Sequence, residues 1–176
     1  MNLVVFSGPP SSGKTSVILK TIDVLKKQGI AVGAVKFDCL YTDDDLLYEK
    51  AGIPVKKGLS GALCPDHFFV SNIEEVVQWG RGLGLSMLIT ESAGLCNRCS
   101  PYIKDIKGIC VIDNLSGINT PKKIGPMLKS ADIVIITKGD IVSQAEREVF
   151  ASRVNSVNPT AIIMHINGLT GQGAYE

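Results

Sequence analysis

Short apolar segments recur along the chain, and segments with a helical pattern of polar and apolar residues separate them. The apolar segments are Leu3–Ser7, Ile30–Phe37, Leu85–Thr90, Ile109–Asp113, Asp132–Thr137 and Ala161–Ile166. Their nearly continuous Val, Ile and Leu content is typical of strands that are buried on both faces of a sheet. We therefore interpret these segments as the strands of a central sheet.

The segments between the strands carry signals for the starts and ends of helices. Lys14–Gln28 begins in a glycine-rich loop and ends before Gly29. Capping boxes, in which a Ser is followed three residues later by a Glu, are offered by Ser71 with Glu74, ahead of Trp79, and by Ser143 with Glu146. The alternation predicts an α/β fold, with a mostly parallel central sheet and helices on both faces. Ligands of such sheets bind beyond the carboxyl ends of the strands.

The chain length of 176 residues fits a single domain, which we place at residues 1–176. The sequence stops at Gly171–Glu176, where a further helix would pack on the sheet, so either a final helix is missing or this edge stays short. We expect no membrane span, because no apolar run reaches the roughly 20 residues that one requires. Met1 leads directly into a strand-like run without the basic start of a secretory signal, so we expect a cytoplasmic protein.

The net charge and the cysteines narrow the function classes. A net charge of +1 argues against a general nucleic-acid surface. In a cytoplasmic chain, five cysteines are more often buried thiols, metal ligands or redox thiols than disulfide partners. Cys110 lies in the apolar run Gly108–Ile112, so we expect it to be a core thiol.

A complete phosphate-binding motif follows the first predicted strand. The pattern G-x-x-x-x-G-K-[ST] is matched by Gly8, Pro9, Pro10, Ser11, Ser12, Gly13, Lys14 and Thr15, and Ser16 follows. With a strand before it and a helix after it, such a loop holds phosphates through backbone N–H groups and the helix N-terminus. We expect Lys14 to bridge the β- and γ-phosphates and the Thr15 hydroxyl to bind Mg²⁺, which predicts a nucleotide hydrolase.

Two later strand ends carry residues that suit the same function. Glu91 follows the run Leu85–Thr90, where its carboxylate could hold Mg²⁺ through water, and the N–H group of Gly94 could sense the γ-phosphate. Thr137, Lys138 and Asp140 stand where GTPases carry N-K-x-D. The Asp of that pattern accepts hydrogen bonds from guanine N1 and N2, a pair of donors that adenine lacks, so Asp140 favours GTP over ATP. Thr137 in place of the Asn weakens this guanine pattern.

The ordered motifs resemble the P-loop metallochaperone GTPases that deliver nickel to urease and hydrogenase, with the chain as a divergent member. Gly8–Thr15 resembles their G-P-x-G-S-G-K-T loop, and Glu91–Gly94 resembles the E-x-x-G that this group has in place of D-x-x-G. Pro121–Pro126 resembles P-R-K-G-G-P of the urease accessory GTPase. Asp38 with Tyr41–Asp44 resembles its N-D-I-Y-T-x-E-D segment, which implies that Asp38 lies near Mg²⁺ and the phosphates.

The remaining candidates are thiols and one imidazole. Cys64-Pro65-Asp66-His67 resembles the Cys-Pro-His metal motif of the urease protein, with Asp66 inserted, whereas the pair Cys96 and Cys99 departs from that protein. Thiolate and imidazole suit Zn²⁺, Cu⁺ and, in planar geometry, Ni²⁺. One chain could supply four ligands, or two chains could share a metal, as the resemblance implies. It stays open whether Cys64 and His67 are incidental loop residues and whether Cys96 and Cys99 are a redox or structural pair. We expect His165, in a strand-like run, to be a core residue.

We expect a Mg²⁺-dependent GTPase with Lys14, Asp38 and Glu91 as catalytic residues, in which Asp38 orients the water or the Mg²⁺ shell. Turnover should be slow, because the sequence offers no obvious Gln to position the water. The cofactors of this GTPase would be GTP or GDP, Mg²⁺, and Ni²⁺ or Zn²⁺. It would be a nucleotide-switched metal-binding accessory protein for a metalloenzyme or its assembly factors, and a nucleotide- or metal-dependent homodimer. Two other classes stay open. One is an ATPase activator or maturation factor that carries an iron–sulfur cluster, for which Cys96 and Cys99 are candidate ligands between two chains. The other is a small-molecule kinase, although the scattered arginines form no cluster that would suit a lid.

Overall fold

One parallel sheet organises the protein, and a computed structural model describes residues 1–94 and 98–174 of it. Within these residues the strands are β1 (Asn2–Ser7), β2 (Val32–Asp38), β3 (Val55–Leu59), β4 (Met87–Ser92), β5 (Lys107–Asp113), β6 (Ile133–Thr137) and β7 (Ile162–His165). Their order across the sheet is β3-β2-β4-β1-β5-β6-β7, and every neighbouring pair is parallel. The predicted α/β fold is therefore confirmed, and the sheet is wholly parallel in this part of the chain.

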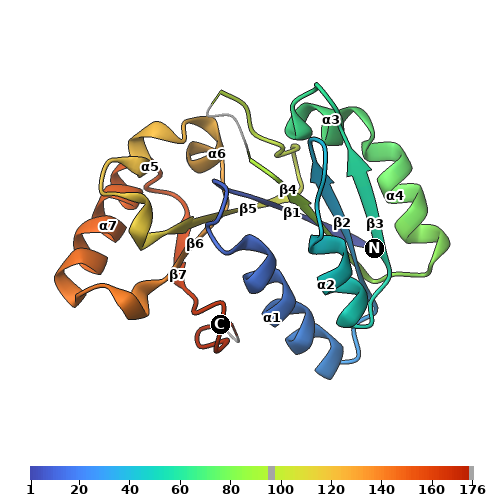
Figure 1. Cartoon of the computed structure of the whole chain (residues 1–176), viewed down its shortest axis with the longest axis horizontal. Helices are drawn as coiled ribbons and strands as arrows, with labels where there is room; N and C mark the ends of the chain where they lie inside the picture. The colour runs from blue at the N-terminus through green and yellow to red at the C-terminus, as the bar shows by residue number, and fades with distance from the viewer. Residues whose placement is uncertain (95–97, 175–176) are drawn as a thin grey trace.

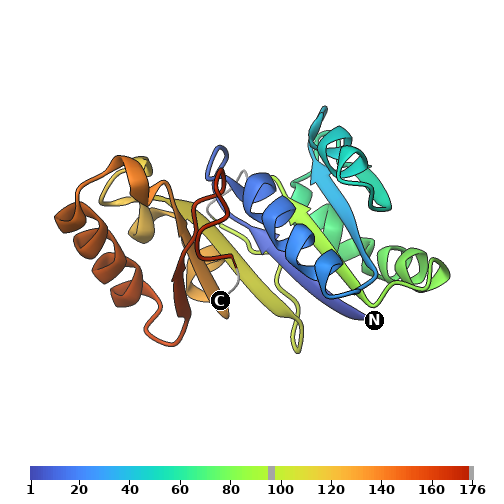
Figure 2. The ribbon, with the colours of Figure 1, turned by 90° about the horizontal axis from the view of Figure 1, so that it is seen from below.

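Helices cover both faces of the sheet (Figures 1 and 2). They are α1 (Lys14–Lys27), α2 (Asp44–Lys50), α3 (Pro65–Ser71), α4 (Ile73–Gly82), α5 (Thr120–Lys123), α6 (Pro126–Lys129) and α7 (Gln144–Val157), with 3-10 turns at Asn114–Ser116 and Gly139–Ile141. In Figure 1, α7 lies at the β7 end of the sheet and α4 at the β3 end. Among the described helices, none is long and apolar enough to cross a membrane.

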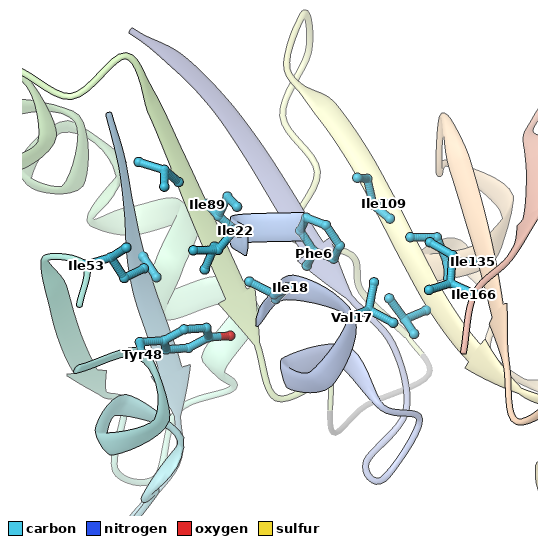
Figure 3. Close-up of a cluster of buried hydrophobic side chains, with 13 residues drawn as sticks. Phe6, Val17, Ile18, Ile22, Tyr48, Ile53, Ile89, Ile109, Ile135 and Ile166 are labelled. Atoms are coloured by element: carbon cyan, nitrogen blue, oxygen red, sulfur yellow. The ribbon is translucent and has the colours of Figure 1, made fainter. Parts of the chain in front are cut away.

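The first face of the sheet is closed by α1. Val17, Ile18 and Ile22 of this helix are fully buried and pack against strand residues such as Phe6 and Ile89 (Figure 3). Each large aliphatic side chain that is buried in this way stabilises the fold by roughly 1.5–3 kcal/mol. Burial along one side of α1 thus fixes the helix, and with it the loop at its N-terminus, against the centre of the sheet.

The opposite face is covered by the remaining longer helices. Residues of α3 and α4 pack on β1, β2 and β4, whereas residues of α6 and α7 pack on β5 and β6. Cys110 is fully buried in the second of these groups, as expected for a core thiol, and burial raises the pKa of its thiol to about 12. The capping box at Ser143 and Glu146 is confirmed, since it opens α7.

Several local predictions were wrong. Ser71 with Glu74 does not form a capping box, because Ser71 is the last residue of α3 and Asn72 is the N-cap of α4. His165 is exposed rather than a core residue, because β7 is the edge strand at this end of the sheet. Strand β3 was missed, because Lys56 and Lys57 interrupt its apolar pattern; charged residues are common on edge strands.

The segment after β7 folds back instead of continuing as a strand. Ile166 and Ala174 pack against the core on the α1 face, and Gly168 and Gly171 lie against Ser16 and Lys20 of α1. Within residues 1–94 and 98–174, turns therefore occupy the place for which the sequence predicted either a missing final helix or a short edge.

Candidate functional site

The loop Gly8–Gly13 joins β1 to α1 at the carboxyl end of the sheet. A Cβ atom on Gly8 would lie 2.0 Å from the carbonyl oxygen of Val111, so only glycine allows the loop to pass this close to β5. The Lys14 ammonium spans the loop and donates to the carbonyl oxygens of Gly8 and Pro9, both at 2.9 Å. Burial lowers the pKa of Lys14, although the Glu91 carboxylate partly opposes this effect.

A cavity of about 520 Å³ opens beside this loop. Among the residues proposed from the sequence, it is lined by Pro10, Ser11, Gly13, Lys14, Thr15, Ser16, Asp38, Glu91 and Lys138. Lys36, Asp44, Leu47 and Ala93 complete the lining. The structure thus gathers the phosphate loop, the end of β2 and the end of β4 around one space. Asp38 lies at the end of β2, and its carboxylate accepts a hydrogen bond from the Cys39 N–H group at 2.8 Å.

Glu91 is at the centre of a buried polar network. Its side chain accepts hydrogen bonds from the Thr15 hydroxyl at 2.9 Å, the Lys36 ammonium at 2.7 Å and the Tyr48 hydroxyl at 2.5 Å. Burial, followed by the Glu91 charge, raises the pKa of Tyr48 well above its ordinary value, so Tyr48 remains a hydrogen-bond donor. The network therefore holds Glu91 against Thr15, the pair of oxygen groups that was proposed for Mg²⁺.

Sequence reasoning missed Lys36, Tyr48 and Asp44 as members of this network. Lys36 also forms an ion pair with Asp44 at 2.6 Å. A usable signal was present, because Lys36 is a charged residue inside the apolar segment Ile30–Phe37. Burying a charge is costly unless it is paired, so a lysine within a buried strand indicates an acidic partner.

Gly94 supports the phosphate loop from behind. Its backbone has φ +62°, and a Cβ atom there would lie 2.0 Å from the Gly8 carbonyl oxygen. The preceding residue, Ala93, donates its N–H group to the Phe37 carbonyl at 3.0 Å, which ties the end of β4 to β2. A movement of this segment would therefore disturb Gly8 directly.

A second cavity, of about 270 Å³, adjoins the loop on the β6 side. Gly13, Ser16, Thr137, Lys138, Asp140, Ile141, Asn167, Gly168 and Leu169 line it. The Thr137 hydroxyl donates to the Ser12 carbonyl at 2.7 Å, and the Lys138 ammonium donates to the Ser11 carbonyl at 2.8 Å. Asp140 is exposed in the 3-10 turn Gly139–Ile141. The sequence reasoning missed the contribution of Asn167, Gly168 and Leu169, which follow an edge strand and carry no motif.

Cys64, His67 and Cys99 come together on the other side of β4. One potential ligand atom from each lies within 4.8 Å of the others, and the two Sγ atoms are 3.4 Å apart. Cys64 is the N-cap of α3 and Pro65 its first residue, so the motif starts a helix instead of lying in a loop. Cys96 lies outside the described residues.

Asp66, between two of these ligands in sequence, is completely buried. Its carboxylate accepts hydrogen bonds from the Ser92 hydroxyl and from the Cys99 thiol, the latter at 3.6 Å. Ser92 directly follows Glu91 on β4, so adjacent residues of one strand contact the phosphate cavity and, through Asp66, the Cys/His cluster. The Pro121–Pro126 segment joins neither site, because it forms α5 and the start of α6 and packs with α7.

Comparisons with known proteins show what the chain is similar to. Residues 2–165 match the family model described as CobW/HypB/UreG, nucleotide-binding domain. Uncharacterized protein MJ0120 of Methanocaldococcus jannaschii is 57% identical over 176 residues, which cover 100% of this chain and 75% of that protein. The urease accessory protein UreG of Trichodesmium erythraeum is 28% identical over 186 residues, covering 96% of this chain and 85% of its own.

Solved structures support the fold in the same way. The hydrogenase maturation factor HypB from Archaeoglobus fulgidus has a TM-score of 0.78 at 20% identity, over 99% of this chain and 85% of its own. HypB from Helicobacter pylori, solved in complex with nickel, has the same TM-score and identity over 99% and 82% of the two chains. At this level of identity the likeness concerns the fold alone.

Proposed function

The chain belongs to the CobW/HypB/UreG family of nucleotide-binding domains, and we propose that it is a Mg²⁺-dependent GTPase whose nucleotide state controls a transition-metal site. The metal is cargo for a metalloenzyme under assembly. The observation that carries this proposal is the pair of consecutive residues on β4, since Glu91 contacts Thr15 in the phosphate cavity and Ser92 contacts Asp66 beside the Cys/His cluster.

The phosphate cavity has the groups that nucleotide hydrolysis needs. Lys14 is held across the loop and would meet the β- and γ-phosphates, and the Thr15 hydroxyl and Glu91 carboxylate are hard oxygen donors that fit Mg²⁺. Bound Mg²⁺ would supply neutralisation of the phosphate charge. Asp38, on the cavity wall, is the candidate for orienting the attacking water. The N–H group of Gly94, which lies behind Gly8, would respond to the presence of the γ-phosphate.

The preference for guanine rests on the second cavity. Asp140 and Lys138 line it, and Thr137 ties it to the phosphate loop through Ser12. An Asp at this position can accept hydrogen bonds from guanine N1 and N2, whereas adenine would leave it without these donors. Thr137 thus retains a connection between the base cavity and the loop although the usual Asn is absent.

The Cys/His cluster is the proposed metal site. Cys64, His67 and Cys99 offer two sulfurs and one imidazole, a set that suits Ni²⁺ or Zn²⁺, and Cys96 is the proposed fourth ligand. Among the relatives, HypB from Helicobacter pylori was solved with nickel and UreG is a urease accessory protein. Metal binding would require deprotonated thiols, so we expect metal affinity to fall as pH falls.

A homodimer is the proposed assembly. The segments 38–41 and 59–63 lie side by side, joined by hydrogen bonds from the N–H groups of Ser60 and Gly61 to the carbonyl oxygens of Asp38 and Cys39. They expose the apolar side chains of Leu40, Tyr41, Leu59 and Leu63 directly before the Cys64 motif. Exposed apolar groups gathered in this way are typical of interaction surfaces.

The proposal is tested by measuring Ni²⁺ and Zn²⁺ affinity, stoichiometry and solution mass with no nucleotide, with GDP and with a non-hydrolysable GTP analogue. We expect tighter metal binding and more dimer with the analogue, and loss of both in Cys64→Ala. Cys39→Ala is the matched control for metal affinity, because Cys39 is a half-buried cysteine that does not belong to the cluster. Metal affinity that is equal in all three nucleotide states would refute the switch.

Three outcomes would change this assignment. A brown protein with visible absorption after anaerobic purification would identify an iron–sulfur carrier, and ADP binding that equals or exceeds GDP binding would identify an adenine site. Phosphate transfer from GTP to a small acceptor, at a rate above hydrolysis, would identify a kinase. Lys14→Ala shows whether hydrolysis or phosphate transfer belongs to this protein or to a contaminating enzyme. It removes the ammonium from the loop and should abolish each nucleotide-dependent activity.

A further inference from the structure

Lys36 is a buried lysine in the wall of the phosphate cavity. It lies in β2, its residue is 3% exposed, and its ammonium contacts Glu91 at 2.7 Å and Asp44 at 2.6 Å. In the sheet register Lys36 is directly opposite Glu91 of β4. The pairing is therefore fixed by the backbone of two central strands and is not a chance contact of flexible side chains.

Two carboxylates pair with this lysine and compensate for the burial of its charge. Burying an ammonium is costly unless it is paired, and the Lys36 ammonium contacts both Glu91 and Asp44. The Lys14 ammonium instead donates to backbone carbonyl oxygens of the loop. The cavity thus contains a paired cation in addition to the lysine of the phosphate loop.

We propose that Lys36 is a resident cation of the nucleotide site, which supplies positive charge to bound phosphates when Mg²⁺ is absent and shares Glu91 with Mg²⁺ when it is present. The inference rests on the proposed function, because it assumes that the cavity binds nucleoside phosphates. Glu91 is the carboxylate offered to Mg²⁺, and an ammonium already in contact with it repels a second cation nearby. Mg²⁺ would therefore bind well only together with nucleotide, whose phosphates offset this repulsion.

A purely structural role predicts a different behaviour. If Lys36 only neutralised Glu91 for folding, its removal would weaken nucleotide binding equally with and without Mg²⁺. If Lys36 is a resident cation, its removal weakens binding mainly without Mg²⁺, and Mg²⁺ compensates for much of the loss. The ratio of the two affinities distinguishes these roles, and it requires no hydrolysis measurement.

The test compares GDP affinity in EDTA and in saturating Mg²⁺ for wild type, Lys36→Met and Lys57→Met. Lys57 is the matched control, since it is the register partner of Lys36 on β3, pairs with Asp45 at 2.6 Å and does not line the cavity. For Lys36→Met we expect affinity in EDTA to fall at least about tenfold, or about 1.4 kcal/mol, a smaller loss in Mg²⁺, and half-maximal tightening at a lower Mg²⁺ concentration. Lys57→Met should match wild type.

The variant Lys36→Gln covers the case in which Lys36→Met folds poorly. It removes the positive charge but keeps a hydrogen-bond donor for the buried Glu91 carboxylate, and it should show the same loss in EDTA. Affinity in EDTA that is unchanged in a folded Lys36 variant, or losses that are equal in EDTA and Mg²⁺, would overturn the inference. If wild type binds no nucleotide at all, the proposed function itself fails, which is a separate result.

Discussion

The Ser92 hydroxyl donates a hydrogen bond to the carboxylate of Asp66, and both side chains are buried at the back of β4. Asp66 belongs to α3, the helix that carries His67 and begins after Cys64. The same carboxylate accepts a hydrogen bond from the Cys99 thiol. Through Asp66, Ser92 therefore connects the strand that carries Glu91 to the Cys99 thiol and to the helix that carries His67.

We expect Ser92→Ala to weaken the dependence of metal affinity on nucleotide. The substitution leaves Asp66 without one of its buried donors, so a shift of β4 is no longer transmitted directly to α3. A coupling of about 1–3 kcal/mol is typical of such linked sites, and we expect it to fall by more than half. The measurement is Zn²⁺ affinity with GDP and with a GTP analogue. Ser156→Ala, on the exposed side of α7, is the control; unchanged coupling in Ser92→Ala would exclude this route.

Thr137 connects β6 to the phosphate loop, and we expect Thr137→Val to destabilise the protein. Thr137 is 2% exposed and donates to the Ser12 carbonyl, which would lose its partner in a buried site. The expected loss is about 1–2 kcal/mol in the free energy of unfolding, measured by urea denaturation. Thr21→Val, which removes a hydroxyl bonded within α1, should cost less than about 0.5 kcal/mol. Equal costs would mean that the bond to Ser12 contributes no special stability.

Base recognition is tested at Asp140. We expect Asp140→Ala to lower GDP affinity at least about tenfold, because two guanine donors lose their acceptor, and to leave ADP affinity unchanged. The measurement is competition binding with both nucleotides. Glu148→Ala removes an exposed carboxylate from the neighbouring helix α7 and serves as the control. A parallel loss of GDP and ADP affinity would assign Asp140 to the cavity structure instead of the base.

The sequence predicted the strands that are buried on both faces and missed the elements whose position depends on tertiary contacts. Central strands such as β5 are buried on both faces, so their composition alone identifies them. Edge strand β3 has no such requirement, and its Lys56 and Lys57 concealed it. The capping pattern at Ser143 was correct, but the same pattern at Ser71 was overridden by the short helix α3, which ends there.

In the candidate site, too, local motifs could be predicted from the sequence, whereas contacts between distant residues could not. The phosphate loop could be predicted because its residues are contiguous, and the backbone geometry needs those glycines in that order. The contact of Lys36 with Glu91 joins residues 55 apart, and that of Cys64 with Cys99 joins residues 35 apart. The first depends on the register of β2 against β4, and the second on the packing of α3 behind β4. Neither is encoded in a local pattern.

Asp132 gives a pH-dependent prediction for stability. The Gly108 N–H group and then the Lys107 ammonium lower the pKa of Asp132. A lowered native pKa stabilises the fold above the unfolded pKa of about 3.9, and this stabilisation is lost as pH falls through the native pKa. We expect Asp132→Asn to reduce the free energy of unfolding at pH 7, by at most about 1 kcal/mol because the group is partly exposed. The reduction is measured as a lower Tm, and we expect it to vanish in strong acid. Lys107→Met should retain most of the stabilisation by Asp132, because the Gly108 N–H group is the larger cause of the lowered pKa. A stability difference between wild type and Asp132→Asn that grows in acid would contradict the assignment.

The close contact between Gly94 and Gly8 leads to the last prediction, that Gly94→Ala impairs nucleotide binding. The new Cβ would lie 2.0 Å from a backbone oxygen of the phosphate loop, at φ +62°, so neither a rotamer change nor a shift of a flexible side chain can relieve the contact. Either Gly94 or the loop must move, and we expect GDP affinity to fall at least about tenfold and stability by about 2 kcal/mol. Gly82→Ala is the matched control, because a Cβ atom there meets nothing within 4 Å. Isothermal titration and urea denaturation measure both quantities. Wild-type affinity in Gly94→Ala would mean that the end of β4 can move away from Gly8 without affecting the nucleotide, and the proposed route from the γ-phosphate to the Cys/His cluster would lose its first step.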